Sequence, residues 1–330
     1  MLVALVACHA PPAMTPPTPP TSSVAVQPGD IVISHVTVVP MTGDRELPDH
    51  SVVIRGERIA AVAPAEQIAA PAGGQVQVID GTGRWLMPGL ADMRVRLGEQ
   101  RELGLYVAAG VTTVRDLSGD GGHLEWRDQA ARGELVGPTI VIADPAAADP
   151  GTWRCPALVA SDRRAALGEP DALKRRVKWL GTVRPVAVRA WLANPGTPEA
   201  IAAAAEEHAG AVRALAALAA DAPILMGTDT GRPFVIAGAS AHEELERMIQ
   251  AGLPRPRVLQ IATAEAARFL GTPGELGVVA AGARADLLLL ASDPNTAPLP
   301  DVPDGVMLRG RWHARADLDG LLAEIASASH

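Results

Sequence analysis

The alternation of strand-like and helix-like segments in the middle of the chain is the feature that most constrains its fold. From Leu90 the sequence predicts a strand over 91–97, a helix over 102–109, a strand over 111–117, a helix over 124–133 and a strand over 139–144. Alternation of this kind is typical of parallel βαβ units. The flanking residues 31–88 and 275–315 instead form short β-rich pieces bounded by Gly, Pro or Asp. The sequence therefore predicts an α/β body with β structure from both chain ends.

The second half of the body continues the alternation after a Pro-rich loop at 144–156. The pattern predicts a charged helix near 170–180, a Val-rich strand over 183–191, a long helix beginning at Thr197 and Pro198, and a strand over 223–229. Further helices are expected over 241–251 and 263–270. Thr197 is a favourable N-cap, and Pro198 stands at the first helical position, where its missing N–H costs nothing.

Composition excludes several classes of partner. The chain has 330 residues, 48 % of them hydrophobic, which is enough for one large domain or two modest ones. The formal net charge is -8, so the chain lacks the basic character expected of a protein that binds nucleic acid. We therefore expect no nucleic-acid partner.

The first eight residues, MLVALVAC, end in a Leu-Val-Ala-Cys sequence that resembles the lipobox of bacterial lipoproteins. In that interpretation residues 1–8 are a lipoprotein signal and Cys8 carries a lipid. Residues 9–29 contain seven prolines and read as an extended tether. The chain would then be anchored to the bacterial cell envelope on its periplasmic side. If the segment is not a signal, a cytoplasmic location follows.

Four segments carry a resemblance to a known family. They are WLMPGLADMRVRL, AGVTTVRDL, ILMGTDTG with the following AHEELERMIQAGL, and GELGVVAAGARADLLLL. In sequence, order and spacing they resemble the metal-dependent amidohydrolase superfamily, closest to its imidazolonepropionase-like and prolidase-like members. The resemblance implies a TIM-type (β/α)8 barrel, with a composite β-sandwich made from both chain ends. It also implies hydrolysis of non-peptide C–N bonds by a metal-activated water.

The metal ligands of that family are largely missing. Its first barrel strand ends in His-x-His, and the matching residues here are Arg94 and Arg96. A guanidinium group offers only donors and cannot ligate a cation. Between Ile140 and Asp229 the only histidine is His208, which lies within the predicted long helix and is expected to be a packing residue. Zinc is therefore implied by the resemblance alone, and we expect no metal or other cofactor.

Asp229 matches the family's last-strand aspartate, which contacts the metal and takes a proton from the attacking water. Two interpretations of this carboxylate stay open: a general base, or a counter-ion of the two arginines that replace the histidines. Thr228, Asp116 and His242 also match family positions around the pocket. Each of two residues also has an alternative to a role at the pocket. For Asp116 it is a structural role, and for His242 it is an exposed position at the N-terminus of a helix.

The length of the α/β body indicates a reduced barrel. From Leu90 to Leu270 there are 181 residues, whereas a (β/α)8 barrel takes ~200 to ~250. We expect residues 89–274 to form a barrel without its fourth to sixth strands, with residues 30–88 and 275–315 forming the composite sandwich. Three functions stay open. They are a hydrolase, a tethered non-catalytic protein that binds a small anion through Arg94 and Arg96, and the product of a decaying gene.

Overall fold

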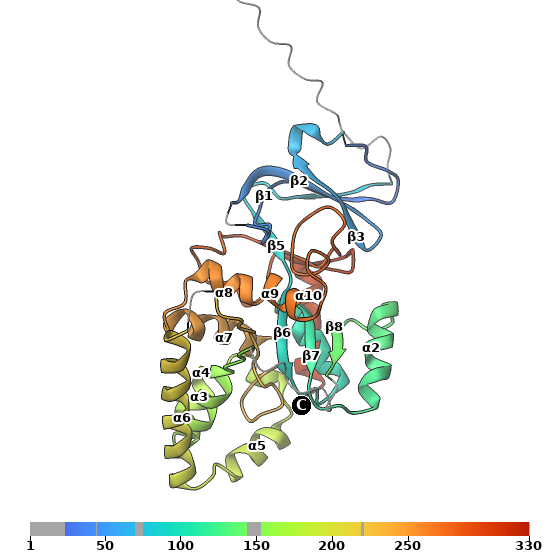
Figure 1. Cartoon of the computed structure of the whole chain (residues 1–330). Helices are drawn as coiled ribbons and strands as arrows, with labels where there is room; N and C mark the ends of the chain where they lie inside the picture. Colours follow the sequence, from blue (N-terminus) through green and yellow to red (C-terminus); the bar gives the residue numbers. More distant parts are fainter. Residues whose placement is uncertain (1–23, 44, 70–74, 144–152, 219–220, 330) are drawn as a thin grey trace, which may run out of the picture.

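The computed structural model describes residues 24–43, 45–69, 75–143, 153–218 and 221–329. The expected lipidation at Cys8, the signal at 1–8 and most of the tether at 9–29 lie outside these residues. The two halves of the molecule are visible in Figure 1, with a sheet that contains the early strands at the top and an α/β region below it. Among the described residues, no helix has both the length and the hydropathy needed to cross a membrane.

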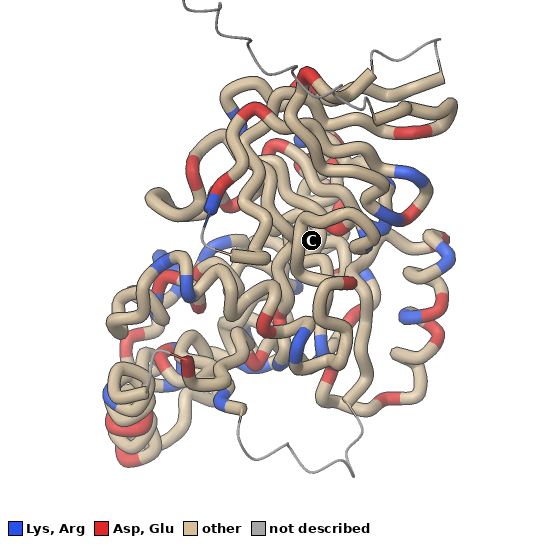
Figure 2. The backbone as a smooth tube through the Cα atoms, turned by 45° about the horizontal axis from the view of Figure 1, so that its top comes forward, with Lys and Arg blue, Asp and Glu red and all other residues tan. Residues whose placement is uncertain are grey.

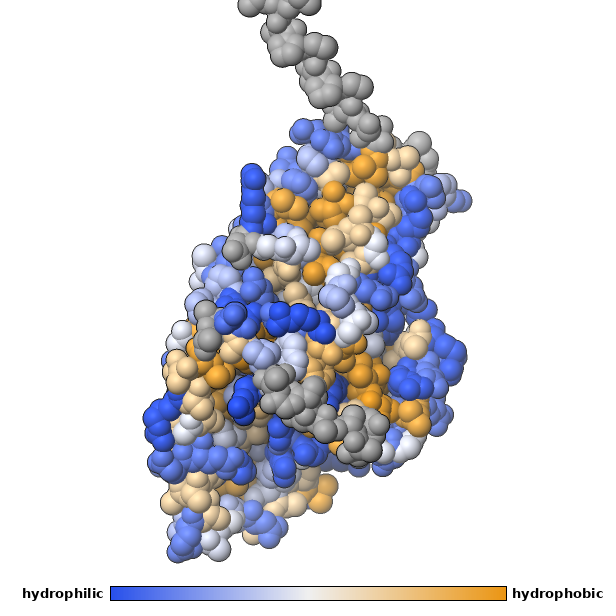
Figure 3. Space-filling view, in the orientation of Figure 1, coloured by the Kyte–Doolittle hydropathy of each residue, from blue (hydrophilic) through white to orange (hydrophobic). Residues whose placement is uncertain are grey.

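Both chain ends contribute to one eight-stranded sheet. Its strands are β1 (Ile31–Val38), β2 (Leu47–Arg55), β3 (Arg58–Pro64), β4 (Gln77–Asp80), β5 (Trp85–Pro88), β9 (Leu287–Leu290), β10 (Gly305–Leu308) and β11 (Arg311–Ala314). The order is β11-β10-β9-β5-β1-β2-β3, with β4 beside β1. The two ends meet where β5 pairs antiparallel with β9, from Trp85 opposite Leu290 to Pro88 opposite Leu287. All four leucines of β9 are buried, which explains why an uninterrupted apolar run forms this central strand. On the face seen in Figure 3, apolar residues gather over this sheet.

The α/β half is built on a second, parallel sheet of β6 (Leu90–Val95), β7 (Val111–Asp116) and β8 (Thr139–Ile142). The predicted strand at 223–229 is an extended segment that runs beside β6. The Met93 N–H donates to the Met226 carbonyl at 2.9 Å, and the Asp229 N–H to the Arg94 carbonyl at 2.7 Å. On its other side, Ile224 pairs with Arg154 in a parallel bridge. Within the described part of the chain this sheet does not close into a barrel.

Helices cover the α/β half and connect its strands. They are α1 (Leu103–Ala108), α2 (Gly122–Arg132), α3 (Leu158–Ala165), α4 (Pro170–Arg176), α5 (Pro185–Ala193), α6 (Pro198–Ala216), α7 (Ala239–Gln250), α8 (Arg255–Ile261), α9 (Ala264–Phe269) and α10 (Arg315–Ser327), with 3-10 turns at Ala65–Gln67, Gln100–Glu102, Ala166–Gly168 and Leu180–Thr182. Helix α6 begins as expected, because the Thr197 hydroxyl accepts a hydrogen bond from the Ala200 N–H at 3.2 Å.

The strand predicted over 183–191 is wrong. Those residues form helix α5, which begins with Pro185 at its first position. Val188, Trp191 and Leu192 are spaced three and four apart and pack on a buried cluster that contains Phe234. That spacing places them on one helical face. The helical period of the apolar residues therefore outweighs the strand propensity of the valines.

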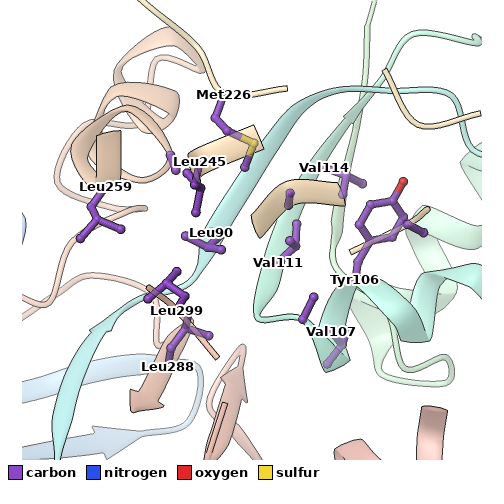
Figure 4. Packing of buried hydrophobic residues seen from close by; sticks show 14 of the residues in the cluster. Leu90, Tyr106, Val107, Val111, Val114, Met226, Leu245, Leu259, Leu288 and Leu299 are labelled. Carbon is purple, nitrogen blue, oxygen red and sulfur yellow. The ribbon is translucent and has the colours of Figure 1, made fainter. Parts of the chain in front are cut away.

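The main core joins the two sheets. Figure 4 shows its side chains, contributed by β6 and β7, by α1, α7 and α8, and by β9 of the first sheet. Leu90 of β6 is fully buried in this cluster, together with Val111 of β7, Val107 of α1 and Leu288 of β9. Because β5 leads through a single glycine, Gly89, into β6, the eight-stranded sheet fixes where the first parallel strand begins. The far end of that strand carries the site described next.

Candidate functional site

Arg94, Arg96 and Asp229 meet where β6 ends. The Arg96 guanidinium contacts one carboxylate oxygen of Asp229, and the Arg94 Nε lies 3.5 Å from the same oxygen. The two strands approach closely at this point because residue 227 is glycine. A Cβ there would lie 2.6 Å from both the Arg94 Cβ and the Cys155 Sγ. The extended segment therefore lies against β6 at the distance that brings the carboxylate to both arginines.

A third arginine completes the cluster. The Nε of Arg232 donates to the other carboxylate oxygen of Asp229 at 3.1 Å. The chain turns sharply between these residues, with Asp229 at φ 58° and Gly231 at φ 100°. An aspartate tolerates this left-handed conformation better than most residues. A Cβ at Gly231 would lie 2.8 Å from the Arg96 carbonyl oxygen, so this turn packs directly on the arginine strand.

The cluster has too few anions for its cations. Three guanidinium groups face one carboxylate, and the Nε of Arg94 is buried without a hydrogen-bond partner. The Asp229 side chain is only 9 % exposed, whereas Arg94 and Arg96 are each 37 % exposed and Arg232 is 49 % exposed. Burial raises the pKa of Asp229, but the charges of Arg94 and Arg96 and the bond from Arg232 outweigh it and the net shift is downward. Lys and Arg are elsewhere interspersed with Asp and Glu (Figure 2).

A second carboxyl group, that of Asp92, lies in β6, the strand that also carries Arg94. Asp92 is fully buried and accepts hydrogen bonds from the Thr228 N–H at 3.0 Å and the Thr228 hydroxyl at 2.6 Å. Burial raises the pKa of Asp92 to about 7, even though these hydrogen bonds oppose the shift. Asp92 is therefore about half ionised at neutral pH, and the arginine cluster still keeps an excess of positive charge. Thr228, expected at the pocket, is instead buried and holds this carboxyl group.

The residues present do not fit a divalent metal. Zinc needs unprotonated nitrogen, thiolate or carboxylate ligands. At this site three cations already surround the Asp229 carboxylate, and the Thr228 N–H and hydroxyl occupy that of Asp92. In the described ranges, no group of three or more His, Cys, Asp and Glu residues could hold a metal ion. A guanidinium group stays charged and repels a cation at any working pH.

The other residues that match family positions have separate roles. Asp116 is buried at the end of β7, where it accepts hydrogen bonds from the Leu97 N–H at 3.2 Å and from His123 at 2.7 Å. His242 is buried in the first turn of α7 and its Nε2 donates to the Ala109 carbonyl at 2.7 Å, so the surface position considered for it is wrong. His208 is half-buried and bonds to the Ser161 hydroxyl at 2.9 Å.

A groove begins beside the cluster. It has a volume of about 240 Å³ and runs between the 98–105 segment, helix α5 and the 230–237 loop. Arg232 belongs to both the cluster and the groove wall, and Gly231 links the groove to Arg96. Leu105, Trp191 and Ile236 give it an apolar surface. The site is thus a cationic cluster with an adjoining, partly apolar hollow.

The fold and the site define an α/β protein with a cationic cluster at the ends of parallel strands. The amidohydrolase family model matches residues 203–313, about a third of the chain. A comparison with curated proteins finds no significant match.

Solved structures with the same architecture include several hydrolases. A protein from Bifidobacterium longum assigned as a prolidase is 22 % identical with a TM-score of 0.67, over 90 % of this chain and 99 % of its own. Bottromycin amidohydrolase is 20 % identical with a TM-score of 0.71, over 92 % of this chain and 91 % of its own. A Xaa-Pro dipeptidase with methionine in its active site is 17 % identical with a TM-score of 0.62, over 86 % and 100 %. At these identities the likeness concerns the fold.

Sequence reasoning missed two residues of the site. Arg232 follows Asp229 by three residues, and its position in GTDTGRP was a signal that a third cation stands near the carboxylate. Asp92 precedes Arg94 by two residues on the same strand, so the period of a strand already placed it in the same row. What the sequence could not provide is the left-handed turn at Asp229, which directs Arg232 back onto the carboxylate.

Proposed function

We propose that this chain is a non-catalytic member of the amidohydrolase superfamily and that it binds a small anion at Arg94, Arg96 and Arg232. The observation that supports the proposal is the charge balance, with three guanidinium groups around one carboxylate at the site where the superfamily holds a dication. Arginine presents paired N–H donors that match a carboxylate or phosphate. A bound anion would supply the missing negative charge.

Hydrolysis of a C–N bond is a poorer account of the same residues. A general base works best with a pKa near the working pH, whereas the pKa of Asp229 is held below its usual range by its arginine neighbours. Its two carboxylate oxygens are also engaged by Arg96 and Arg232. This carboxylate therefore serves as a counter-ion in our proposal.

We also propose that the α/β half is a reduced barrel that lacks the superfamily's fourth to sixth strands. Two observations support this. The segment at 224–230 lies beside β6, at the edge of the sheet of β6, β7 and β8, and Arg154 pairs with Ile224 on the far side of that segment. The missing strands would carry the remaining metal ligands of the family. One deletion would then account for both the open sheet and the absent ligands.

Calorimetric titration with inorganic phosphate and with acetate tests anion binding. We expect saturable binding that weakens as the salt concentration rises, because the arginines are partly exposed. The double variant Arg94→Gln with Arg96→Gln should lose it. Arg257→Gln is the matched control, because Arg257 is also partly buried and paired with one carboxylate, Glu265, at 2.9 Å but lies outside the cluster. Wild-type protein that binds neither anion would contradict the proposal.

Elemental analysis and an unfolding measurement separate the alternatives. One tightly held zinc per chain, or metal-dependent hydrolysis, would favour the enzyme over the binding protein. A cooperative thermal transition is expected for a functional binding protein, whereas its absence would point to the product of a decaying gene.

The membrane attachment is a proposal from the sequence. If Cys8 carries a lipid, the full-length protein should fractionate with bacterial membranes and Cys8→Ala should release it. Equal fractionation of the two proteins would contradict the anchor and leave residues 1–29 as an unanchored extension. The anion site does not depend on this outcome.

A further inference from the structure

We infer that the anion bound at the arginine cluster carries an apolar group of about the size of an aromatic ring, which lies in the groove against Trp191. This inference rests on the proposed anion site and specifies its ligand. The geometry behind it is the continuity of the two features. Arg232 contacts Asp229 with its Nε and also lines the groove, so an anionic group held by Arg232 lies at the mouth of the groove.

The groove has the size and the surface that such a group needs. An apolar cavity of about 150 Å³ is enough to bind benzene, and this groove measures about 240 Å³. Its apolar lining comes from Leu105, from Ala187 and Trp191 of α5, and from Val235 and Ile236. A ring placed there would be stabilised by burial and by its contact with the Trp191 indole.

Trp191 packs on a buried residue behind the groove. The Trp191 ring packs on Phe234 with 5.1 Å between ring centroids. Phe234 is fully buried at φ 62°, a left-handed conformation that a bulky residue rarely adopts. Its carbonyl oxygen accepts a hydrogen bond from the buried Arg163 at 3.2 Å. Backbone strain of this kind persists where the surroundings impose it, and such positions concentrate at binding sites.

The charges of the other lining residues disfavour a second anionic group on the ligand. Glu99 lines the groove together with Arg101 and Arg184, and it pairs with both of these arginines, at 2.6 Å and 3.3 Å. Glu102 also lines the groove, and burial raises the pKa of its carboxyl group. These acids balance Arg101 and Arg184, so the free cations are those of the cluster. The ligand class is therefore a monoanion with an uncharged, ring-sized tail.

Titration with 3-phenylpropionate, propionate and inorganic phosphate tests this inference on the full chain. We expect 3-phenylpropionate to bind roughly tenfold more tightly than propionate, because only it buries a ring. Equal affinities would overturn the inference while leaving the anion site intact. If phosphate, propionate and 3-phenylpropionate all fail to bind, the proposed function itself fails.

Two neighbouring residues of α5 give a matched pair of variants. Ala187 lines the groove, whereas Val186 is 60 % exposed and does not line it. Ala187→Trp should fill the groove and abolish the advantage of 3-phenylpropionate, with phosphate binding unchanged. Val186→Trp should keep both. An advantage that persists in a normally folded Ala187→Trp protein would place the ring elsewhere and overturn the inference.

Tryptophan fluorescence provides a readout that does not depend on filling the groove. Binding of 3-phenylpropionate should change the emission of the wild-type protein, and Trp191→Phe should lose most of that change while retaining affinity within a few-fold, since phenylalanine keeps an aromatic face. Propionate should leave the emission unchanged in both proteins. An undiminished ligand-induced change in Trp191→Phe would show that the ring does not contact this residue.

Discussion

Within the described residues, three arginines surround an aspartate in two clusters, and the two clusters differ in the number of carboxylates that neutralise the arginines. In the helical layer, Asp162 contacts Arg163 at 3.2 Å, Arg176 at 3.1 Å and Arg247 at 2.6 Å. A second carboxylate, Glu243, also contacts Arg163 and Arg247 there. Arg163 is only 1 % exposed and Arg247 is 19 % exposed. Arg176 is 44 % exposed. Two carboxylates thus face three arginines in this cluster, two of which are largely buried, and the cluster joins α3, α4 and α7.

In the cluster around Asp229, no second carboxylate of the described residues forms an ion pair with the three arginines. Its three arginines are 37–49 % exposed, and the groove begins beside one of them. Packing alone would favour a balanced cluster, because unpaired buried charge is costly. The comparison is in line with our proposal that the Asp162 cluster is structural and that the Asp229 cluster binds an external anion. The following variants break or sharpen that distinction.

The largest loss of stability is expected for Asp162→Asn. The substitution leaves three arginines, one of them fully buried, with Glu243 as their only counter-ion. We expect the free energy of unfolding to fall by about 3–5 kcal/mol, which is typical when a buried ion pair loses one partner. Urea denaturation measures it. Adding phosphate should not restore the loss, and a rescue by phosphate would show that this cluster is also open to anions.

A smaller loss is expected for Asp229→Asn, because water screens its arginines. Asparagine tolerates the left-handed backbone at this position, so the effect reports on charge. We expect a decrease of about 2–3 kcal/mol in the free energy of unfolding, below the value for a fully buried pair. Adding Arg94→Gln should restore part of it. Here phosphate should raise Tm more than in the wild type, since a further cation is unpaired.

Asp49→Asn is the matched control for that variant. Asp49 also has a left-handed backbone, at φ 48°, and pairs with one partner, His35, at 2.8 Å on the exposed side of the first sheet. The same chemical change there should leave stability within experimental error and should not alter the response to phosphate. An equal loss at both positions would mean that the backbone conformation, and not the arginine cluster, determines the effect.

The sequence predicted the parts of the molecule whose pattern is local. The alternation after Leu90 indicated β6, α1, β7, α2 and β8, and Thr197 marked the start of α6. It did not reveal α3, whose first two N–H groups are capped by the distant Glu244 at 2.9 Å and 2.6 Å. Contacts of that range are invisible to local patterns, as is the turn that adds Arg232 to the cluster. The first sheet was predictable because its short β-rich pieces are bounded by Gly, Pro or Asp.

Asp92 makes stability depend on pH in the opposite sense from the arginine clusters. Its pKa is raised to about 7 in the folded protein from 3.8 in the unfolded chain. The folded state therefore binds the proton more tightly than the unfolded chain. The contribution of this proton to the free energy of unfolding is fully present below about pH 4 and is lost as the pH rises through about 7. We expect Asp92→Asn, which stays neutral, to gain about 1–2 kcal/mol relative to the wild type between pH 5 and pH 8. Parallel stability profiles of the two proteins would contradict the assignment.

The smallest measurable loss is expected at Asp30 of the first sheet, where one carboxylate faces one arginine. Asp30 is buried and accepts two hydrogen bonds from Arg55, at 2.9 Å and 2.8 Å, and one from the Gln27 N–H at 2.8 Å. The bond from Arg55 is the main reason that its pKa is lowered, although burial opposes the shift. Because Arg55 is 43 % exposed, water can solvate its guanidinium group when the carboxylate is removed.

Asp30→Asn should therefore lower the free energy of unfolding by only about 1 kcal/mol at pH 7. The contribution of a carboxyl group with a lowered pKa is present above its unfolded value and lost as the pH falls through the folded one, so the difference should vanish in acid. Phosphate should have no effect on this variant, since a single arginine with a neutral amide leaves no cluster of free cations. A phosphate response as large as that of Asp229→Asn would mean that any unpaired arginine of this protein recruits an anion, and the distinction between the two three-arginine clusters would then lose its functional meaning.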